Sequence, residues 1–429
     1  MRSHRFFLCA ATFIAIIATG ALSGCGGGGG SSTSASAPAS APAPASAPAA
    51  PAPASASDTK APAPDNTVAQ STTPNVQPIR VAKLDSGTRN MLMTSVTLCV
   101  PGTDNCQTID NIQVDTGSQG LRILASALSP TLALPAITST NGSSVAQCAV
   151  FGTGYTWGAV RSADIRLAGQ TAGATSVQVI ADPAVPAAAV DCTQSGLPML
   201  TAARLRSNGI LGVGPFIADC GGACASSPLP RWYYACASGN CVASTLAVAQ
   251  QVTNPVARFP ADNNGVLIEL PAVPDAGAPA VAGTMTFGIG SQSNNLLGDA
   301  TVLQGSALSG YVNTIFSGNT YSTSFIDSGS NGLFFPSTSL TVCGLWYCPP
   351  TPQSFAATLR STSGTTRDVN FAVSTSTTLF ASGNNAFSNL AGPVGNYFDW
   401  GLPFFFGRRV FTALEGRVTP AGVGPYYAF

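Results

Sequence analysis

The sequence predicts an all-β, or at least β-rich, protein built from two related halves, and three observations carry this prediction. The 429 residues include Gly 45 and Pro 32, together with many Ser, Thr and Ala, which favours short strands and turns over long helices. Short runs of alternating apolar and polar residues recur along the chain, as expected for strands. One stretch also occurs twice, at residues 114–124 and 326–336.

The repeated stretch is centred on an aspartate. Residues 114–124 read VDTGSQGLRIL, and residues 326–336 read IDSGSNGLFFP. The positions that are identical are Asp115, Gly117, Ser118, Gly120 and Leu121 in the first copy and Asp327, Gly329, Ser330, Gly332 and Leu333 in the second. Such a repeat indicates a duplicated lobe in which each copy supplies one carboxylate.

The first residues have the pattern of an export signal. Arg2 and Arg5 precede an apolar run over residues 6–22, which is too short and wrongly flanked for a membrane span. We therefore expect residues 1–24 to be a signal peptide that is removed.

The signal ends in a motif that resembles a bacterial lipobox, because Leu22-Ser23-Gly24 precedes Cys25. In such lipoproteins the cysteine becomes the lipidated first residue, and several acyl chains hold a protein stably to a membrane. Gly26 rather than Asp follows it, which by the same resemblance favours the outer membrane. We expect an exported, lipid-anchored protein of the bacterial cell envelope; the alternative is an ordinary signal peptide that is cut elsewhere.

Residues 25–75 follow as polyglycine and then Ala, Pro and Ser with scarcely a large apolar residue. Such a composition cannot bury a core. We interpret the segment as a disordered tether that separates the folded body from the membrane.

The histidine count and the low charge content restrict the chemistry that the protein can perform. The sequence has one histidine, His4, in the expected signal peptide, which excludes Ser-His-Asp and Cys-His catalysis and the usual histidine-containing metal sites. Only 8% of the residues are charged and the net charge is zero, so no nucleic-acid partner is expected. Paired carboxylates are the best-supported chemistry, and we expect no metal and no cofactor.

The cysteines agree with export. Of Cys 12 in the sequence, Cys9 lies in the signal and Cys25 at the lipid site, which leaves an even number. The closely spaced ones are Cys99 and Cys106, Cys220 and Cys224, Cys236 and Cys241, and Cys343 and Cys348, with Cys148 and Cys192 left over. We expect five disulfides with a connectivity that the sequence does not fix. The alternative is a four-cysteine zinc site at residues 220, 224, 236 and 241.

Strand-like runs divide the body into lobes at 76–290 and 291–429. In the first lobe, runs at 91–100 and 109–114 form a hairpin that leads into Asp115, and further runs lie at 163–167, 176–180, 266–270 and 284–287. One helix is expected, over 245–252. In the second lobe, the runs at 300–302, 311–315 and 321–326 precede Asp327.

The context of the two aspartates resembles that of pepsin-like aspartic peptidases. Each follows an apolar strand and precedes Gly-Ser and another apolar run, whereas Asp85, in a further Asp-Ser-Gly, lacks the downstream pattern. The resemblance extends over most of residues 76–429. It implies a bilobal acid-protease fold with a cleft between two pseudo-duplicated lobes.

Three further stretches carry the same resemblance and stand in the family's order. Residues 151–158 look like the hairpin, called the flap, that closes over the substrate. Residues 208–212 look like the hydrophobic-hydrophobic-Gly element behind the first catalytic loop, and residues 400–405 with 410–414 look like its counterpart in the second lobe.

The resemblance assigns roles around a catalytic pair, Asp115 and Asp327. Two adjacent carboxylates share a proton, so that one activates a water and the other donates to the substrate carbonyl. The residues that would support this dyad are Thr116 and Ser328, which cross-link the loops, Gly117 and Gly329, which offer N–H groups, and Ser118 and Ser330, which bond the outer carboxylate oxygens. Ordinary turn chemistry is the alternative for these side chains.

Several positions depart from the family pattern. Phe151 replaces the tyrosine at the flap tip, and Arg122 replaces its tryptophan partner, so a cation–π contact is expected there. With Gly152 and Thr153 these residues would form the flap and contact substrate. Asp399 stands where the family prefers an apolar residue, and residues 220–241 form an insertion without a clear counterpart.

These observations predict an exported, lipid-anchored aspartic endopeptidase that acts as a monomer on polypeptides. The alternative is a catalytically silent protein of the same fold that binds peptide or glycan at the cell envelope. A rigid surface domain with a structural role is a third possibility.

Overall fold

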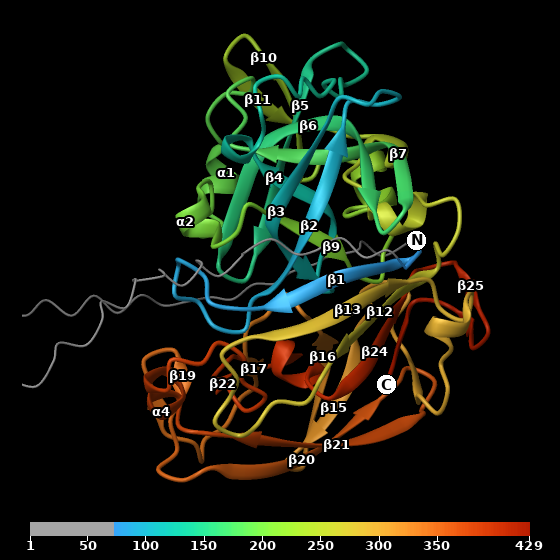
Figure 1. The fold of residues 1–429 in the computed structure, drawn as a ribbon. Coiled ribbons are helices and arrows are strands. Elements are labelled where there is room, and N and C mark those ends of the chain that lie inside the picture. The colour runs from blue at the N-terminus through green and yellow to red at the C-terminus, as the bar shows by residue number, and fades with distance from the viewer. Residues whose placement is uncertain (1–72) are drawn as a thin grey trace, which may run out of the picture. The chain divides into compact units, whose positions relative to one another are not determined.

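The computed structural model describes residues 73–429, and these residues form mainly β-strands (Figure 1). The expected signal peptide, Cys25 and nearly all of the expected tether lie outside the described residues. The prediction of an all-β protein is confirmed. Among the described residues no helix is long and apolar enough to cross a membrane.

The strands of the first half include all of the predicted runs, and several further strands were not predicted. They are β1 (Val76–Val81), β2 (Leu92–Cys99), β3 (Cys106–Asp115), β4 (Gln119–Leu124), β5 (Ser144–Phe151), β6 (Gly154–Leu167), β7 (Gln170–Ile180), β8 (Leu197–Pro198), β9 (Gly209–Val213), β10 (Tyr233–Ala237), β11 (Asn240–Ala243), β12 (Gly265–Leu270) and β13 (Val281–Phe287). The predicted hairpin before Asp115 is β2 and β3, which pair from Cys99 opposite Cys106 to Met93 opposite Gln113.

The second half adds shorter strands. They are β14 (Val302–Gln304), β15 (Val312–Phe316), β16 (Asn319–Ile326), β17 (Leu333–Phe334), β18 (Val342–Cys343), β19 (Trp346–Tyr347), β20 (Gln353–Arg360), β21 (Thr366–Val373), β22 (Ala391–Gly392), β23 (Phe398–Trp400), β24 (Arg408–Ala413), β25 (Val418–Thr419), β26 (Gly422–Val423) and β27 (Tyr426–Ala428). The strand expected at 300–302 begins only at Val302, because pairing of β14 with β27 starts there, opposite Ala428.

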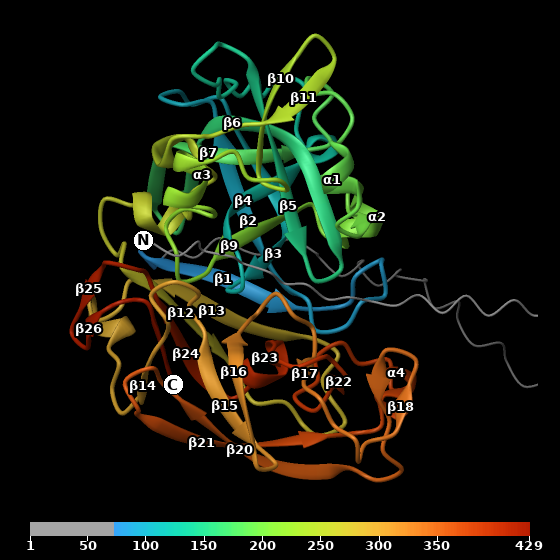
Figure 2. The same cartoon turned by 180° about the vertical axis from the view of Figure 1, so that it is seen from behind.

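One large sheet connects the two halves of the chain. Its 16 strands run in the order β11-β10-β5-β6-β7-β4-β9-β3-β2-β1-β13-β12-β24-β27-β14, with β8 beside β6. Strands β1, β13 and β12 therefore lie between strands of the first half and the last strands of the chain. Figure 1 shows the blue and green strands β2–β9 on one side of β1 and β13 and the orange strands β15, β16, β20 and β21 on the other, and Figure 2 shows the same division from behind.

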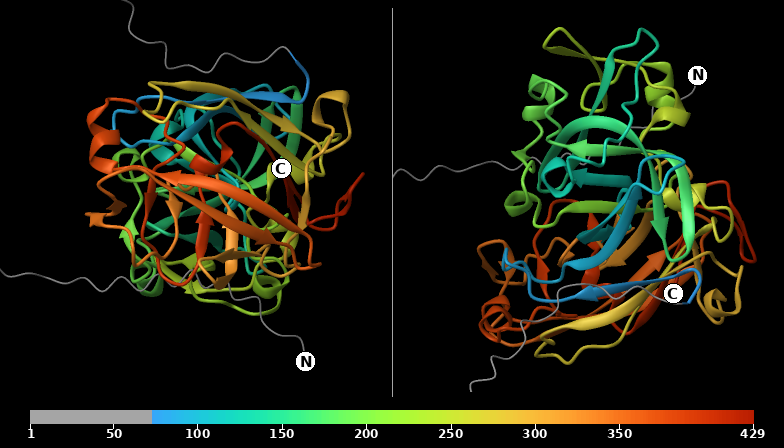
Figure 3. Two further views of the ribbon diagram at one scale, coloured as in Figure 1. Left: turned by 90° about the horizontal axis from the view of Figure 1, so that it is seen from below. Right: turned by 45° about the horizontal axis from the view of Figure 1, so that its top comes forward.

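The second sheet belongs to the second half alone. It has 7 strands in the order β21-β20-β15-β16-β23-β17-β22. The right panel of Figure 3 shows β1, in blue, beside the yellow β13, with which it pairs.

Helices are short in the described residues. The α-helices are α1 (Val190–Thr193), α2 (Ala202–Leu205), α3 (Gly222–Ser226) and α4 (Ser376–Ala381), and the 3₁₀ helices are η1 (Ala125–Ala127), η2 (Val248–Gln250), η3 (Pro255–Arg258), η4 (Ser293–Asn295) and η5 (Leu402–Phe405). The helix predicted over 245–252 is wrong, since only η2 forms. The Gln251 side chain binds the backbone of Gly221 and Leu246, and these tertiary contacts override local helix propensity.

The core behind the second aspartate is aromatic. Phe398 and Trp400, both on β23, stack at 4.4 Å between ring centroids, and Phe335 stacks on Phe398 at 5.1 Å. Trp400 is fully buried, and its indole N–H donates to Thr314 Oγ1 at 3.0 Å. Buried and closely packed aromatic rings of this kind support the loop that contains Asp327.

The five predicted disulfides are present. They join Cys99 to Cys106, Cys148 to Cys192, Cys220 to Cys224, Cys236 to Cys241 and Cys343 to Cys348. The four cysteines of the alternative zinc site are thus paired with one another as two disulfides. Five disulfides indicate an exported protein, because such bonds persist in oxidising compartments.

Candidate functional site

The first aspartate lies in a loop enclosed by three strands. Strand β3 ends at Asp115 and β4 begins at Gln119, and β9 lies between them, parallel to β3 and antiparallel to β4. Asp115 pairs with Gly212 of β9. A Cβ at Gly212 would lie 2.7 Å from the Gln119 backbone, so glycine is needed for this close approach.

The second aspartate lies in a loop of the same construction. Strand β16 ends at Ile326, directly before Asp327, and β17 begins at Leu333. Strand β23 lies between them, parallel to β16 and antiparallel to β17. The Asp327 N–H donates to the Trp400 carbonyl at 3.0 Å. The duplicated sequence is therefore matched by duplicated local topology.

Four hydrogen bonds cross-link the two loops. Thr116 Oγ1 donates to the Ile326 carbonyl at 3.0 Å and accepts from the Ser328 N–H at 2.9 Å. In the reverse direction, Ser328 Oγ donates to the Val114 carbonyl at 2.9 Å and accepts from the Thr116 N–H at 3.1 Å. Both side chains are buried. The structure thus brings the two halves together at the residues that the repeat singled out.

Each carboxyl group receives two hydrogen bonds from its own loop. Asp115 Oδ1 accepts from the Gly117 N–H at 2.7 Å, and Oδ2 accepts from Ser118 Oγ at 2.5 Å.

Asp327 repeats the pattern, with 2.7 Å from the Gly329 N–H to Oδ1 and 2.8 Å from Ser330 Oγ to Oδ2. These bonds fix both carboxyl planes, so neither group can turn away from the other.

The glycines of the loops lie against the opposite carboxyl group. A Cβ placed on Gly117 would lie 2.7 Å from Asp327 Cγ, and one on Gly329 would lie 2.5 Å from Asp115 Oδ1. Any side chain here would push the aspartates apart. The two carboxyl groups lie close enough for a side-chain hydrogen bond between them.

The environment of Asp327 favours its neutral form. Burial contributes most to a pKa well above the ordinary value, followed by the negative charges of Asp115 and Asp399 and by the hydrogen bond with Asp115. Asp115 is 6% exposed. A pair of this kind carries one shared proton where isolated carboxyl groups would both be ionised.

The predicted flap is the hairpin of β5 and β6, which turns at residues 151–154. Gly152 and Thr153 are exposed at its tip. Phe151 lies over Arg122, with 5.6 Å from the guanidinium carbon to the ring centroid. Arg122 itself is 3% exposed, so its effect on a bound molecule would pass through Phe151.

Arg122 is held by a buried polar network that the sequence did not suggest. Its guanidinium forms an ion pair with Asp219 at 3.2 Å and donates to the Gln119 carbonyl at 2.7 Å. Asp219 also accepts hydrogen bonds from Tyr233, at 2.6 Å, and from Gln147. Burial raises the pKa of Asp219 to about 6, against the lowering effect of Arg122.

Comparison with known proteins places the chain in a family. A model of the family described as a protein of unknown function (DUF3443) matches residues 71–429. The chain belongs to the DUF3443 family. The match includes both aspartate loops, the flap hairpin and every disulfide, and it excludes the expected signal peptide and most of the tether. No curated protein matches the chain significantly.

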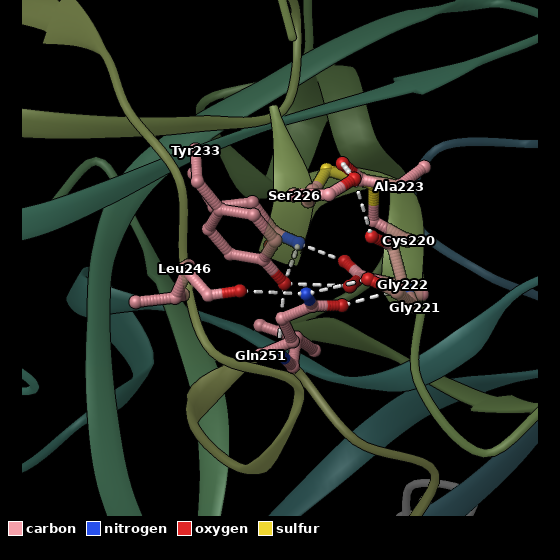
Figure 4. The surroundings of a disulfide bond; sticks show 12 residues. Cys220, Gly221, Gly222, Ala223, Ser226, Tyr233, Leu246 and Gln251 are labelled. Atoms are coloured by element: carbon pink, nitrogen blue, oxygen red, sulfur yellow. Dashed lines mark hydrogen bonds between the residues drawn. A yellow bond between two sulfur atoms is a disulfide. The ribbon is translucent and has the colours of Figure 1, made fainter. Parts of the chain in front are cut away.

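In this DUF3443 protein residues 220–241, which were expected to be an insertion, form a packed unit. Figure 4 shows the Cys220–Cys224 disulfide beside Gln251, whose amide bonds both the N–H and the carbonyl of Gly221. The Tyr233 hydroxyl accepts from the Val252 N–H at 2.8 Å. Tyr233 is buried, so the aromatic residues of the insertion are not all available to a bound molecule.

The structure also places the other residues that the sequence analysis considered. Asp85, in the other Asp-Ser-Gly, lies exposed in a turn outside both loops. In the part of the chain that the structure describes, no three His, Cys, Asp or Glu side chains gather as a metal site would require. Asp399, by contrast, is buried, and its charge contributes to the raised pKa of Asp327.

Proposed function

We propose that this protein is an aspartic endopeptidase that hydrolyses peptide bonds with a water activated by Asp115 and Asp327. The observation that carries the proposal is the pair of cross-linked loops, which hold two carboxyl groups within hydrogen-bonding reach of one another. No other pair of titratable side chains among the described residues combines this proximity with a duplicated scaffold.

The environments of the two carboxyl groups suggest a division of roles. Asp327 holds the shared proton and would donate it to the carbonyl oxygen of the scissile bond. Asp115 would then accept a proton from water, and the resulting hydroxide would attack the carbonyl carbon. After the tetrahedral intermediate forms, the proton now on Asp115 would pass to the leaving nitrogen and the C–N bond would break. A hydroxyl proton of the intermediate would return to Asp327, which restores the starting state of the pair.

The topology around the loops supports a pepsin-like bilobal fold. Strands β9 and β23 occupy equivalent places behind the two aspartates. The hairpin of β5 and β6 has the sequence position that the resemblance gives to the flap. These features favour a substrate site between the two halves, with Phe151 at its edge.

The deciding experiment is cleavage of an unfolded protein by the purified intact protein between about pH 3 and about pH 7. We expect cleavage with an acid optimum that a statine-type inhibitor blocks. Asp115→Asn and Asp327→Asn should each lower kcat by more than about a thousandfold, and the double variant should lose little more, because the pair acts as a unit.

Asp85→Asn is the matched control, since it changes the exposed Asp-Ser-Gly and should leave cleavage intact. The absence of statine-sensitive cleavage from the unaltered protein would overturn the proposal.

A silent binding protein of the same fold is the second candidate, and the flap is the observation that favours it. Phe151 has no hydroxyl group to hydrogen-bond a substrate, and its partner Arg122 is buried. Retained binding of a statine-type peptide without cleavage would support this alternative.

For the location, we propose that Cys25 carries a lipid that anchors the exported protein to the outer membrane. The proposal rests on the Leu22-Ser23-Gly24-Cys25 motif. Cys25→Ala should move the protein from the membrane fraction to the soluble fraction. Unchanged membrane association of this variant would show that the anchor lies elsewhere.

A further inference from the structure

A glutamine of the first half holds the backbone of the second aspartate loop. Gln113 lies on β3, two residues before Asp115, and its side-chain Nε2 donates to the Gly329 carbonyl at 2.7 Å. A carbonyl oxygen only accepts hydrogen bonds, so the amide nitrogen must face it. Gln113 is 8% exposed, and water therefore competes little for this bond. The bond joins the two halves of the chain at a place that the repeated sequence did not suggest.

Gly329 lies between the two carboxyl groups. Its N–H donates to Asp327 Oδ1 at 2.7 Å, and its Cβ position lies 2.5 Å from Asp115 Oδ1 and 3.1 Å from Asp327 Oδ1. Glycine has more backbone freedom than any other residue, so a glycine in this place needs restraint from its neighbours. With its carbonyl bound to Gln113, Gly329 is held at both its N–H and its C=O.

The duplicated scaffold has no equivalent of this bond in the other half. Phe325 stands two residues before Asp327, as Gln113 stands two residues before Asp115. The Phe325 side chain has no hydrogen-bond donor and stacks on Tyr397 at 5.9 Å between ring centroids. An apolar side chain therefore satisfies this place in the scaffold, whereas a buried amide must find hydrogen-bond partners. The amide of Gln113 needs an explanation other than the fold.

The strands behind the two loops hold them in the same way. The Ser118 carbonyl accepts from the Gly214 N–H at 2.9 Å, and the Ser330 carbonyl accepts from the Leu402 N–H at 2.7 Å. The bond from Gln113 is thus an addition to the shared scaffold, and it acts on the second loop alone.

We propose that Gln113 is a positioning residue of the dyad: its amide fixes the Gly329 carbonyl, so that the Gly329 N–H stays on Asp327 Oδ1 and the two carboxyl groups keep their relative position. Among the described residues, the Gln113 side chain donates to Gly329 and to Met91 Sδ and makes no hydrogen bond to either carboxyl group. Its effect on the reaction therefore passes through Gly329. This inference rests on the proposed function of the dyad.

The first test is Gln113→Leu, which removes the donor and keeps a side chain of similar size. In the cleavage assay this variant should lower kcat about tenfold with KM unchanged, because a displaced catalytic group slows the reacting step without altering substrate contacts. Gln107→Leu is the matched control, since Gln107 also lies on β3 and donates to a carbonyl, that of Ala127, at 2.8 Å. It should leave kcat within about twofold. An unchanged kcat in Gln113→Leu, or a loss that appears in KM instead, would overturn the inference.

The second test is Gln113→Glu, which separates hydrogen bonding from packing. A protonated carboxyl group has the shape of the amide and still donates a hydrogen bond, whereas an ionised one only accepts and repels the Gly329 carbonyl. At about pH 3 the new group is protonated, and kcat should be within about threefold of the unaltered protein. As the pH rises and the group ionises, kcat should fall toward that of Gln113→Leu, which stays low at every pH. Equal kcat values for the two variants at about pH 3 would show that the donor has no role and that the inference is wrong.

A carboxyl titration separates this inference from the proposed function. In the intact protein labelled with ¹³C at the Asp carboxyl carbons, the resonance of Asp327 is the one that Asp327→Asn removes. Gln113→Leu should raise the pH at which it titrates by about half a unit, because a weaker hydrogen bond from Gly329 favours the ionised form less. If the protein cleaves nothing, the function is wrong and this shift still supports the position that Gln113 gives to Gly329. If cleavage depends on Asp115 and Asp327 while neither kcat nor this titration responds to Gln113→Leu, the function stands and the role of Gln113 is wrong.

Discussion

Individual buried carboxyl groups in this protein are stabilised in two different ways. Asp219 has a cation, Arg122, at 3.2 Å and two further donors. Asp327 and Asp399 lie beside other carboxyl groups, and no ion pair among the described residues includes either. The first arrangement is typical of structural support, because the charges compensate each other. The second arrangement is typical of reactive sites, because it keeps carboxyl groups protonated at a pH where they normally ionise.

At the residue scale we predict that Arg122→Leu destabilises the fold by about 3 to 5 kcal/mol. Removing the guanidinium leaves Asp219 buried without its cation, and breaking one partner of a buried pair has this typical cost. The measurement is the urea midpoint of unfolding at neutral pH.

Arg166→Leu is the control, because the ion pair of Arg166 with Asp104 lies at the surface and should matter little. Equal midpoints for the two variants would show that the buried network around Arg122 contributes no more stability than the surface ion pair.

At the element scale, two strands perform the same task in different chemical settings. Strand β9 supports the Asp115 loop with aliphatic residues, whereas β23 supports the Asp327 loop with Phe398, Trp400 and Asp399. In each case a glycine permits contact with the loop: Gly212 lies within β9, and Gly401 directly follows β23. A Cβ on Gly401 would lie 2.0 Å from the Gly332 carbonyl oxygen, which is closer than the 2.7 Å between a Cβ on Gly212 and the Gln119 backbone.

The disulfide between Cys148 and Cys192 should contribute more stability than the other four. It closes a loop with a sequence separation of 44 that contains the flap hairpin, whereas the bond between Cys236 and Cys241 spans only 5. The entropy of loop closure gives about 4 kcal/mol for the long loop and about 2 kcal/mol for the short one.

The measurement is the unfolding free energy of two double variants, Cys148→Ala with Cys192→Ala, and Cys236→Ala with Cys241→Ala as the matched control. A larger loss from the short loop would contradict the prediction.

Elements were predictable from the sequence where local pattern and tertiary pairing agree. The strands that lead into Asp115 and Asp327 alternate clearly and end in Gly-containing turns, so their positions followed from the residues. The hairpin at 151–154 was instead predicted from the resemblance of residues 151–158 to the flap. The helix expected over 245–252 failed because Gln251 satisfies backbone groups at Gly221, thirty residues away in the chain. A contact between residues so far apart in the sequence does not affect the local pattern of apolar and polar residues.

Some residues of the candidate site were also predictable from the sequence, and others were not. The repeat identified Asp115, Asp327 and their hydroxyl neighbours, because duplication is visible in a sequence. Asp219 gave no such signal, since nothing near it in the sequence indicates that Arg122 will lie beside it. Asp399 was visible as a departure from an apolar pattern, but its nearness to Asp115 depends on the parallel pairing of β16 with β23.

At the scale of the whole molecule, the low charge content makes a few buried groups dominate the response to pH. Only 8% of residues are charged, with no net charge, so general repulsion contributes little between pH 4 and pH 8. The buried carboxyl groups of Asp219, Asp327 and Asp399 all have a raised pKa, chiefly through burial.

The direction of these shifts predicts a protein that is more stable in acid than at neutral pH. A carboxyl group with a raised pKa binds its proton more tightly in the folded state, so its contribution is fully present below the unfolded value of about 4 and is lost as the pH rises through the folded value. For Asp219 the loss falls between about pH 4 and its folded pKa of about 6, and Asp327 and Asp399 extend it to higher pH. We therefore expect the urea midpoint to be higher at about pH 5 than at about pH 8, and Asp399→Asn to flatten the decline above pH 6. A midpoint that rises with pH over this range would mean that these groups ionise freely in the folded protein. It would therefore contradict the shared proton on which the proposed chemistry depends.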